Sequence, residues 1–278
     1  MSDKTILLIT GGNTGIGYET VKELLSSPVP YTIIMGSRSI DKAKDAISTL
    51  TSENPNSKSE IVPLQVDIVD DESIDQAYKE VESKWGKIDI LVNNAGMRRA
   101  SFDGIMQQKP GAAGIREAWQ TSYSVNVTST QVMTTIFMPL LLKSSTPRLL
   151  FVTSGLSSLT TCSSGLISAM QRPNPPAGWP KPFEPSHITY RSSKTALNMM
   201  MLYWNRLLKE DGVKVWCISP GFLATGLGGV GKEVLKKFGA GDASIGGEFI
   251  RKVVEGERDA DVGKVVNYLN REHGVQPW

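Results

Sequence analysis

Apolar runs and amphipathic stretches alternate along this chain of 278 residues. Short, almost continuously apolar runs, which fit strands buried on both faces of a parallel sheet, cover residues 5–10, 31–37, 61–66, 88–92, 148–153, 213–218 and 265–268. Segments with helical periodicity or helix-capping acids cover residues 15–26, 40–50, 70–85, 119–142, 190–209 and 247–255. This alternation predicts an α/β fold, a doubly wound parallel sheet of about seven strands with helices on both faces.

One stretch interrupts the alternation, at about residues 157–187, which are rich in Ser, Pro and Gly. Five prolines between Pro173 and Pro182 exclude a continuous helix or a central strand there. An interdomain linker is the alternative, but the patterns on both sides belong to one sheet. We therefore predict a single domain over residues 1–278 with an ordered loop inserted at 157–187, in which Ser157 and Ser158 are polar loop residues. Glycine-rich residues at about 223–246 predict a mobile lid.

Composition and charge narrow the function classes. Thirty basic and 28 acidic residues leave a net charge of +2, which gives no electrostatic reason to expect nucleic acid or an anionic membrane as partner. Cys162 and Cys217 have no metal-ligand spacing, so we expect no metal site and no disulfide framework. We find no signal peptide, and no apolar run approaches the roughly 20 residues of a membrane-spanning helix. The expected location is cytoplasmic.

A glycine-rich turn, TGGNTGIG over residues 10–17, joins the first predicted strand to the first predicted helix. Bare N–H groups and the helix dipole at such a turn bind a dinucleotide pyrophosphate, and glycine lets the anion approach closely. The pattern alone also fits an ordinary tight turn, but its place between strand and helix favours a phosphate site. The candidate cofactor-binding residues of the turn are Thr10, Gly11, Asn13, Thr14, Gly15, Ile16 and Gly17.

The spacing TGxxxGxG resembles the classical branch of the short-chain dehydrogenase/reductase family, and further motifs follow in that family's order. These are Asn94, Ala95 and Gly96 after the fourth strand, Asn126 in the long helix, Ser154 at the end of the fifth strand, Tyr190 and Lys194 as YxxxK, and Pro220, Gly221 and Thr225 as PGxxxT. The resemblance covers essentially the whole chain. It implies a Rossmann fold and an oxidoreductase similar to NADPH-dependent carbonyl reductases.

The end of the second strand indicates which nicotinamide cofactor is used. An acid at this place binds the adenosine ribose, whereas an arginine accommodates a 2′-phosphate. Here Ser37 and Arg38 occupy the strand end and no acid does, so we predict NADP(H). The alternative is that Arg38 is an ordinary exposed side chain. The resemblance further implies that Asp67 bonds the adenine amino group and that Ile68 flanks the ring; for Asp67 a helix cap is the alternative.

Tyr190 and Lys194 are spaced i, i+4 and therefore share one face of a helix. A nearby ammonium favours the phenolate and lowers the pKa of tyrosine, which makes Tyr190 a competent proton donor to a carbonyl oxygen. The resemblance implies that Ser154 polarises the carbonyl, that Asn126 holds a relay water and that Lys194 also bonds the nicotinamide ribose. It also implies cofactor contacts from Pro220, Gly221, Leu223 and Thr225.

The sequence says less about the substrate than about the cofactor. Apolar and aromatic residues in the loops after Gly96 and after Ser154 favour a hydrophobic carbonyl or alcohol, although simple packing explains them equally well. The insertion resembles that of monomeric carbonyl reductases, so we expect a monomer. Two other functions stay open, a regulatory protein that binds cofactor without turnover and a lyase or epimerase. We interpret His187 as a loop residue and Cys217 as a core residue.

Overall fold

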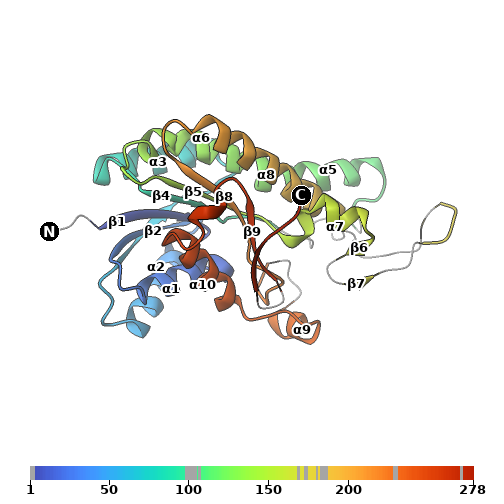
Figure 1. Ribbon diagram of the computed structural model, residues 1–278, viewed down its shortest axis with the longest axis horizontal. Helices are drawn as coiled ribbons and strands as arrows, with labels where there is room; N and C mark the ends of the chain where they lie inside the picture. Colours follow the sequence, from blue (N-terminus) through green and yellow to red (C-terminus); the bar gives the residue numbers. More distant parts are fainter. Residues whose placement is uncertain are drawn as a thin grey trace.

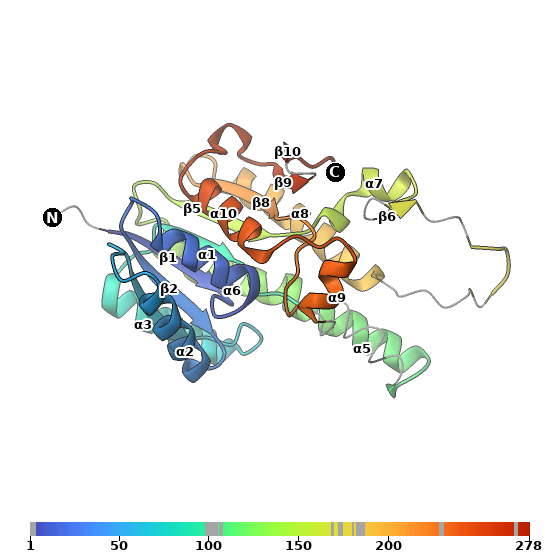
Figure 2. The same ribbon diagram turned by 90° about the horizontal axis from the view of Figure 1, so that it is seen from below.

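Seven parallel strands and one antiparallel edge strand form the central sheet in the part of the chain that the computed structural model describes, residues 4–97, 105, 108–167, 170–171, 175–179, 181, 187–227, 231–269 and 272–278. The strand order is β10-β9-β8-β5-β4-β1-β2-β3, and β10 alone in this sheet pairs antiparallel, with β9 (Figure 2). The strands are β1 (Thr5–Thr10), β2 (Tyr31–Ser37), β3 (Glu60–Gln65), β4 (Ile90–Asn93), β5 (Arg148–Val152), β8 (Lys214–Ser219), β9 (Val265–Leu269) and β10 (Glu272–Val275).

The doubly wound sheet predicted from the apolar runs is confirmed. The seven predicted strands are the seven parallel ones, and their bounds differ from the prediction by at most two residues. β1 and β2 are buried along almost their whole length, as expected for parallel strands covered on both faces. β10 was not predicted, because its four residues carry no apolar run.

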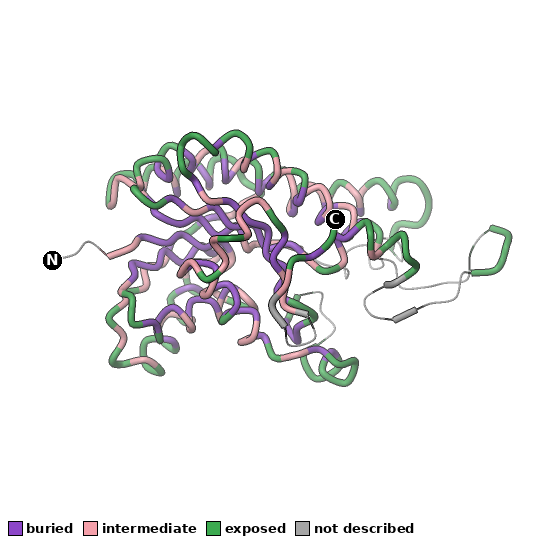
Figure 3. Tube along the Cα trace, in the orientation of Figure 1, coloured by how far each residue is buried: buried purple, intermediate pink, exposed green. Residues whose placement is uncertain are grey.

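Helices cover both faces of the sheet (Figure 1). One layer contains α3 and the long α6 and α8, and the other contains α1, α2 and α10. On each face, buried hydrophobic side chains of the strands and of the covering helices pack into one cluster. Figure 3 shows the buried residues along the strands of the sheet. The helices are α1 (Gly15–Leu25), α2 (Ile40–Glu53), α3 (Asp71–Trp85), α5 (Ala112–Tyr123), α6 (Ser129–Leu141), α7 (Leu159–Ser163), α8 (Ile188–Leu207), α9 (Lys232–Lys237) and α10 (Ala243–Val254). No helix among the described residues is long and apolar enough to cross a bilayer.

The helix predicted over residues 119–142 forms, but it begins earlier, at Ala112, and contains a π turn. α5 ends at Tyr123, a π-helical turn covers Ser124–Thr128, and α6 begins at Ser129. Asn126 lies at the centre of the π turn and is buried, and its side chain is fully engaged with neighbouring segments. π turns of this kind widen a helix locally and often accompany functional sites.

The inserted segment contains more structure than the predicted loop. It begins with a 3-10 turn at Gly155–Ser157 and continues as α7 and a two-stranded antiparallel hairpin of β6 (Leu166–Ile167) and β7 (Met170–Gln171). Most of its proline-rich part lies outside the described residues. The predicted lid contains α9 and the start of α10. Figure 2 shows α5, α7 and α9 at the end of the molecule to which the parallel strands run.

Candidate active site

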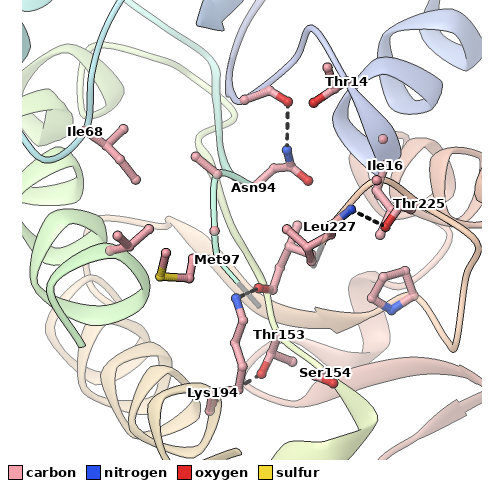
Figure 4. Close-up of a pocket in the computed structure, with 18 of the residues that line it drawn as sticks. Thr14, Ile16, Ile68, Asn94, Met97, Thr153, Ser154, Lys194, Thr225 and Leu227 are labelled. Carbon is pink, nitrogen blue, oxygen red and sulfur yellow. Dashed lines mark hydrogen bonds between the residues drawn. The ribbon is translucent and has the colours of Figure 1, made fainter. Parts of the chain in front are cut away.

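A cavity of about 660 Å³ opens at the carboxyl ends of β1, β2, β4, β5 and β8. Ligands of doubly wound sheets bind at this edge, where the strand order reverses on either side of the first strand. Figure 4 shows Thr14 and Asn94 at one end of the cavity and Thr153, Ser154 and Lys194 at the other. The predicted site residues that line it are Gly11, Asn13, Thr14, Gly15, Ile16, Ser37, Arg38, Asp67, Ile68, Asn94, Ala95, Gly96, Ser154, Tyr190, Lys194, Pro220, Gly221, Leu223 and Thr225.

Three predicted site residues, Thr10, Gly17 and Asn126, do not line the cavity. Thr10 and Gly17 lie behind the wall that the glycine-rich turn (residues 10–17) forms. A Cβ added to Gly17 would lie 2.3 Å from the carbonyl oxygen of Gly11 and 2.6 Å from Nδ2 of Asn94. Gly17 therefore allows the first turn of α1 to fold against the strand end, which shapes the wall rather than contacting a ligand.

Thr10 joins two strand ends. Its hydroxyl oxygen accepts hydrogen bonds from the backbone N–H groups of Asn94 (3.1 Å) and Ala95 (3.0 Å). Asn94 Nδ2 in turn donates to the carbonyl oxygens of Thr10 (2.9 Å) and Gly11 (3.1 Å). These bonds hold the glycine-rich turn after β1 against the turn after β4, so the two motifs form one surface.

The glycine-rich turn fits a dinucleotide cofactor. Gly11 and Gly15 have φ values of +65° and +58°, which side chains rarely adopt, so the backbone stays open toward the cavity. The N-terminus of α1 points its free N–H groups at the same space. The backbone, without side chains in the way, provides what a pyrophosphate needs.

The residues predicted to contact the adenosine part of the cofactor line the cavity near the ends of β2 and β3. Ser37 is buried and its hydroxyl donates to the carbonyl oxygen of Ser39 (3.0 Å), whereas Arg38 is exposed at the rim. Asp70, not Asp67, caps α3, so the helix-cap alternative for Asp67 is wrong. Asp67 Oδ1 accepts from the Val69 backbone N–H (3.2 Å), and Arg38, Asp67 and Lys194 are the charged residues among the described lining.

A short turn after β5, here called the serine turn (residues 154–158), carries Ser154. The Ser154 hydroxyl oxygen accepts a hydrogen bond from the backbone N–H of Leu156 (3.2 Å). Because the oxygen acts as acceptor there, its own proton can donate to a ligand in the cavity. The prediction of Ser157 and Ser158 as polar loop residues is wrong, since each is only 1% exposed.

α8 brings Tyr190 and Lys194 to the cavity from one helix face. Both side chains are buried, and Lys194 Nζ lies 5.9 Å from the centre of the Tyr190 ring. Lys194 Nζ donates to the carbonyl oxygen of Val152 at 2.8 Å. Burial lowers the pKa of Lys194 to about 8, because the ammonium is removed from water. The amine therefore still carries its proton at neutral pH.

Asn126 organises the neighbourhood of Lys194. Its Oδ1 accepts from the Met97 backbone N–H (2.8 Å), and its Nδ2 donates to the Met97 carbonyl (3.1 Å) and to the Ser193 hydroxyl (3.0 Å). A Cβ added to Gly96 would lie 3.2 Å from Asn126 Oδ1 and 3.4 Å from Lys194 Nζ. The side-chain amide thus ties the turn after β4 to α8.

The turn after β8 closes the cavity from the other side. Gly221 has a φ of +100°, and Thr225 Oγ1 accepts from the Leu227 backbone N–H (3.3 Å). Thr225 also lies next to the glycine-rich turn, since a Cβ added to Gly15 would be 3.6 Å from its Cβ. Within the predicted lid, Leu223 forms a backbone bridge with Gly241.

Several lining residues were not predicted: Val66, Val69, Met97, Val125, Val152, Thr153, Leu156, Gly226 and Leu227. Most are apolar residues at or just beyond strand ends, and in the sequence they are indistinguishable from core positions. Their position relative to the strand ends is the only signal that could have found them, because the carboxyl edge of a parallel sheet is where ligands bind.

Comparisons with known proteins agree with this geometry. A family model described as short chain dehydrogenase matches residues 5–165. The short-chain dehydrogenase/reductase tropE of Talaromyces stipitatus is 46% identical over 278 residues, covering 100% of this chain and 99% of the relative. The short-chain dehydrogenase/reductase eupG of Phoma sp is 46% identical over 282 residues, covering 99% and 98%.

Solved structures show the same fold. An NADPH-bound carbonyl reductase from chicken fatty liver has a TM-score of 0.72 at 20% identity, covering 100% of both chains. Carbonyl reductase Sniffer of D. melanogaster has a TM-score of 0.71 at 20% identity, covering 99% of this chain and 100% of that one. With the family model and the two fungal relatives, this shows that the chain belongs to the short-chain dehydrogenase/reductase family.

Proposed function

We propose that this protein is an NADPH-dependent ketoreductase, or in reverse a secondary-alcohol dehydrogenase, acting on a hydrophobic carbonyl. The observation that carries the proposal is that Tyr190, Lys194 and Ser154 line one cavity together with the glycine-rich turn, with Lys194 Nζ 5.9 Å from the centre of the Tyr190 ring. A buried cation beside a phenol, with a free hydroxyl donor next to it, is suited to protonating a carbonyl oxygen.

The bound cofactor supplies or accepts the hydride at the carbonyl carbon. In the proposed mechanism Tyr190 gives its phenolic proton to the carbonyl oxygen, and the Lys194 ammonium stabilises the phenolate that remains. Ser154 donates a hydrogen bond to the same oxygen while negative charge develops on it. Asn126, which bonds Met97 and Ser193, would hold a relay water that links Lys194 to solvent and returns the proton.

Arg38 supports NADP(H) as the cofactor. It lies exposed at the rim of the cavity, next to the buried Ser37, where it can form paired hydrogen bonds to a phosphate. Asp67, the acid that lines this end, lies at the end of the third strand rather than the second. Family-fold structures in complexes with NADPH, NADP and NADH are all known, so the fold leaves this choice to such residues.

The lining beside Ser154 supports an apolar substrate. Met97, Leu156, Leu223 and Leu227 line the cavity, and Lys194 is the charged side chain among the described residues at this end. An uncharged alicyclic or aryl carbonyl loses little hydration on entering such a surface. We also propose that one copy of the chain is sufficient for activity, which light scattering of the active enzyme would test.

Tyr190→Phe tests the reaction. Turnover of NADPH with cyclohexanone, acetophenone and menadione would be compared between wild type and variant. Removing the proton donor should lower kcat by roughly 10²–10⁴-fold while cofactor binding persists. A variant that reduces a ketone at the wild-type rate would refute the mechanism. A wild type that binds NADPH but turns over none of a broad carbonyl panel would instead favour a regulatory role.

Arg38→Ser tests the cofactor choice. Replacing the guanidinium should weaken NADPH binding by about tenfold or more and leave NADH binding nearly unchanged, because only NADPH carries the 2′-phosphate. Fluorescence titration of both nucleotides against both proteins measures this. Arg116→Ser on α5, which does not line the cavity, is the matched control. Tighter wild-type binding of NADH than of NADPH would contradict the proposal.

A further inference from the structure

A closed network of buried polar side chains lies directly beneath Ser154, outside the lining of the cavity apart from Thr153. Its centre is the Ser157 hydroxyl, which donates to the Ser154 carbonyl oxygen (2.6 Å) and accepts from Asn198 Nδ2 (2.9 Å) and Gln276 Nε2 (3.0 Å). Thr153 donates to Asn198 Oδ1 at 2.8 Å. The network therefore joins β5, α8 and the segment after β10 at one point.

Three donors converge on the carbonyl oxygen of Ser154. They are the Ser157 hydroxyl at 2.6 Å, the Ser157 backbone N–H at 3.0 Å and Gln276 Nε2 at 3.3 Å. The orientation of the Gln276 amide follows from this arrangement, because the opposite orientation would place its oxygen against another acceptor. The Ser154–Gly155 peptide is consequently held in one orientation.

Gln276 makes this contact at a cost. Its side chain is buried, and its Oε1 has no hydrogen-bond partner among the residues that the structure describes. A buried acceptor left without a donor opposes folding, because it loses its hydrogen bonds to water. A buried apolar side chain at position 276 would avoid that cost, so the structure offers no packing reason for an amide. The part of the side chain that forms hydrogen bonds is Nε2, which donates to the Ser154 carbonyl oxygen and to the Ser157 hydroxyl.

The segment that carries Gln276 is anchored on both sides. The Gln276 backbone N–H donates to the Val265 carbonyl at 2.8 Å. The main-chain oxygen of Trp278 accepts from the Ser158 hydroxyl (3.3 Å) and from the Thr160 backbone N–H (2.5 Å). The segment therefore spans from β9 to the start of α7 and holds the amide under the serine turn.

We propose that Gln276, acting through Ser157, is a positioning residue for Ser154. Rotation of the Ser154–Gly155 peptide would displace the Leu156 N–H that now bonds the Ser154 hydroxyl, and with it the direction of that hydroxyl. The network prevents this rotation and keeps the hydroxyl aimed at the carbonyl of the substrate. The inference rests on the proposed catalytic role of Ser154.

The test is a double-variant comparison with Gln276→Met, which keeps the length of the side chain and removes its donors. NADPH turnover is followed with the ketone that the wild type reduces fastest. In the wild-type background kcat should fall by about tenfold with little change in KM, as for a misdirected donor. In the Ser154→Ala background the same substitution should have no further effect, because the hydroxyl it orients is gone.

Two controls separate positioning from folding. Gln131→Met on α6 makes the same chemical change away from the serine turn and should leave kcat unchanged. Ser157→Ala and Ser157→Thr repeat the comparison independently of Gln276. Threonine keeps the hydroxyl and should retain most of the turnover that alanine loses, and this also decides the case if Gln276→Met does not fold.

The results distinguish failure of the proposed role of Ser154 from failure of the proposed role of Gln276. If Ser154→Ala keeps wild-type turnover, the proposed role of Ser154 is refuted. If Ser154→Ala loses turnover but Gln276→Met lowers kcat by the same factor in both backgrounds, or in neither, Gln276 does not act through Ser154 and the inference is overturned.

Discussion

The two walls of the cavity are built in different ways. The surface of the glycine-rich turn is backbone, and its shape depends on side chains being absent. A Cβ added to Gly17 would lie only 2.3 Å from the carbonyl oxygen of Gly11. The serine turn is formed by side-chain hydrogen bonds that arrive from α8 and from the segment after β10, 122 positions away in the chain. The motif of the first wall lies within eight consecutive residues, and Asn94 adds two hydrogen bonds to it from the turn after β4. The second wall combines a local turn with side chains that only the assembled fold brings to it.

This difference suits the two tasks. A pyrophosphate is bound by N–H groups of the main chain, which needs close approach and no side-chain chemistry. A reacting carbonyl needs one hydroxyl and one phenol held within a narrow range of directions, which requires support from packed neighbours. We therefore expect substitutions in the glycine-rich turn to abolish binding, and substitutions beneath the serine turn to slow the reaction.

Gly17→Ala should have the largest effect on stability and cofactor binding. The added methyl group would meet backbone and cannot be relieved by a side-chain rotation, so we expect a loss of about 3 kcal/mol or more in the free energy of unfolding. NADPH binding should be lost with it. Urea unfolding and nucleotide titration measure both quantities.

Gly155→Ala in the serine turn is the matched control for Gly17→Ala. Its added methyl group would be 3.7 Å from the nearest atom, an ordinary contact, so the free energy of unfolding should change by less than about 0.5 kcal/mol. Equal losses in the two variants would contradict the contrast between a backbone wall and a side-chain wall.

Lys194→Met should stabilise the protein while abolishing turnover. The fall in the pKa of Lys194 from 10.5 to about 8, caused by burial, corresponds to roughly 3 kcal/mol held against folding at neutral pH. Loss of the bond to Val152 offsets part of it, so we expect a net gain of about 2 kcal/mol. Thermal or urea unfolding at pH 7 measures the gain.

The pH dependence of this difference gives a second readout. Between pH 8 and pH 10.5 the folded chain has released the Lys194 proton and the unfolded chain still binds it. The free energy of unfolding of the wild type should therefore rise relative to Lys194→Met over this interval, and should not change below it. A constant difference from pH 7 to pH 10.5 would show that the amine is not desolvated.

Thr10→Val should change the free energy of unfolding less than Gly17→Ala or Lys194→Met does. It removes the acceptor of the Ala95 backbone N–H and one of two acceptors of the Asn94 backbone N–H, which also donates to the Val92 carbonyl oxygen. This should cost about 1–2 kcal/mol of unfolding free energy and weaken NADPH binding. Thr135→Val, an exposed residue on α6 with a local hydrogen bond, is the control and should change stability by less than about 0.5 kcal/mol. Equal effects would show that the two turns are not coupled.

Prediction from sequence succeeded where the signal was local. The apolar runs of β1 and β2 and the spacing of Tyr190 and Lys194 follow from period and propensity alone, and the structure places them as expected. It failed where the neighbours are distant. The helix expected over residues 119–142 was predicted without its π turn at Ser124–Thr128, where Asn126 contacts Met97 and Ser193.

Ser157 and Gln276 show most clearly what cannot be predicted from the sequence. In the sequence, Ser157 opens a stretch rich in Ser, Pro and Gly, and Gln276 lies close to the polar residues 270–273. Nothing in the sequence around either residue indicates burial. In the fold they are buried against each other, at a distance of 3.0 Å. A polar side chain becomes a buried partner only through the segments packed around it, and no window of the sequence contains those segments.

The sequence by itself determined the strand–turn–helix unit at residues 5–25, the pairing of Tyr190 with Lys194 on one helix face, and the family resemblance that these motifs carry. The tertiary structure alone decided what holds Ser154 in place, since the strand order β10-β9-β8-β5 is what carries Gln276 beneath it. The physical reason is range. Backbone conformation and helical period act over a few residues, whereas a buried hydrogen bond requires the chain to bring both partners out of water together.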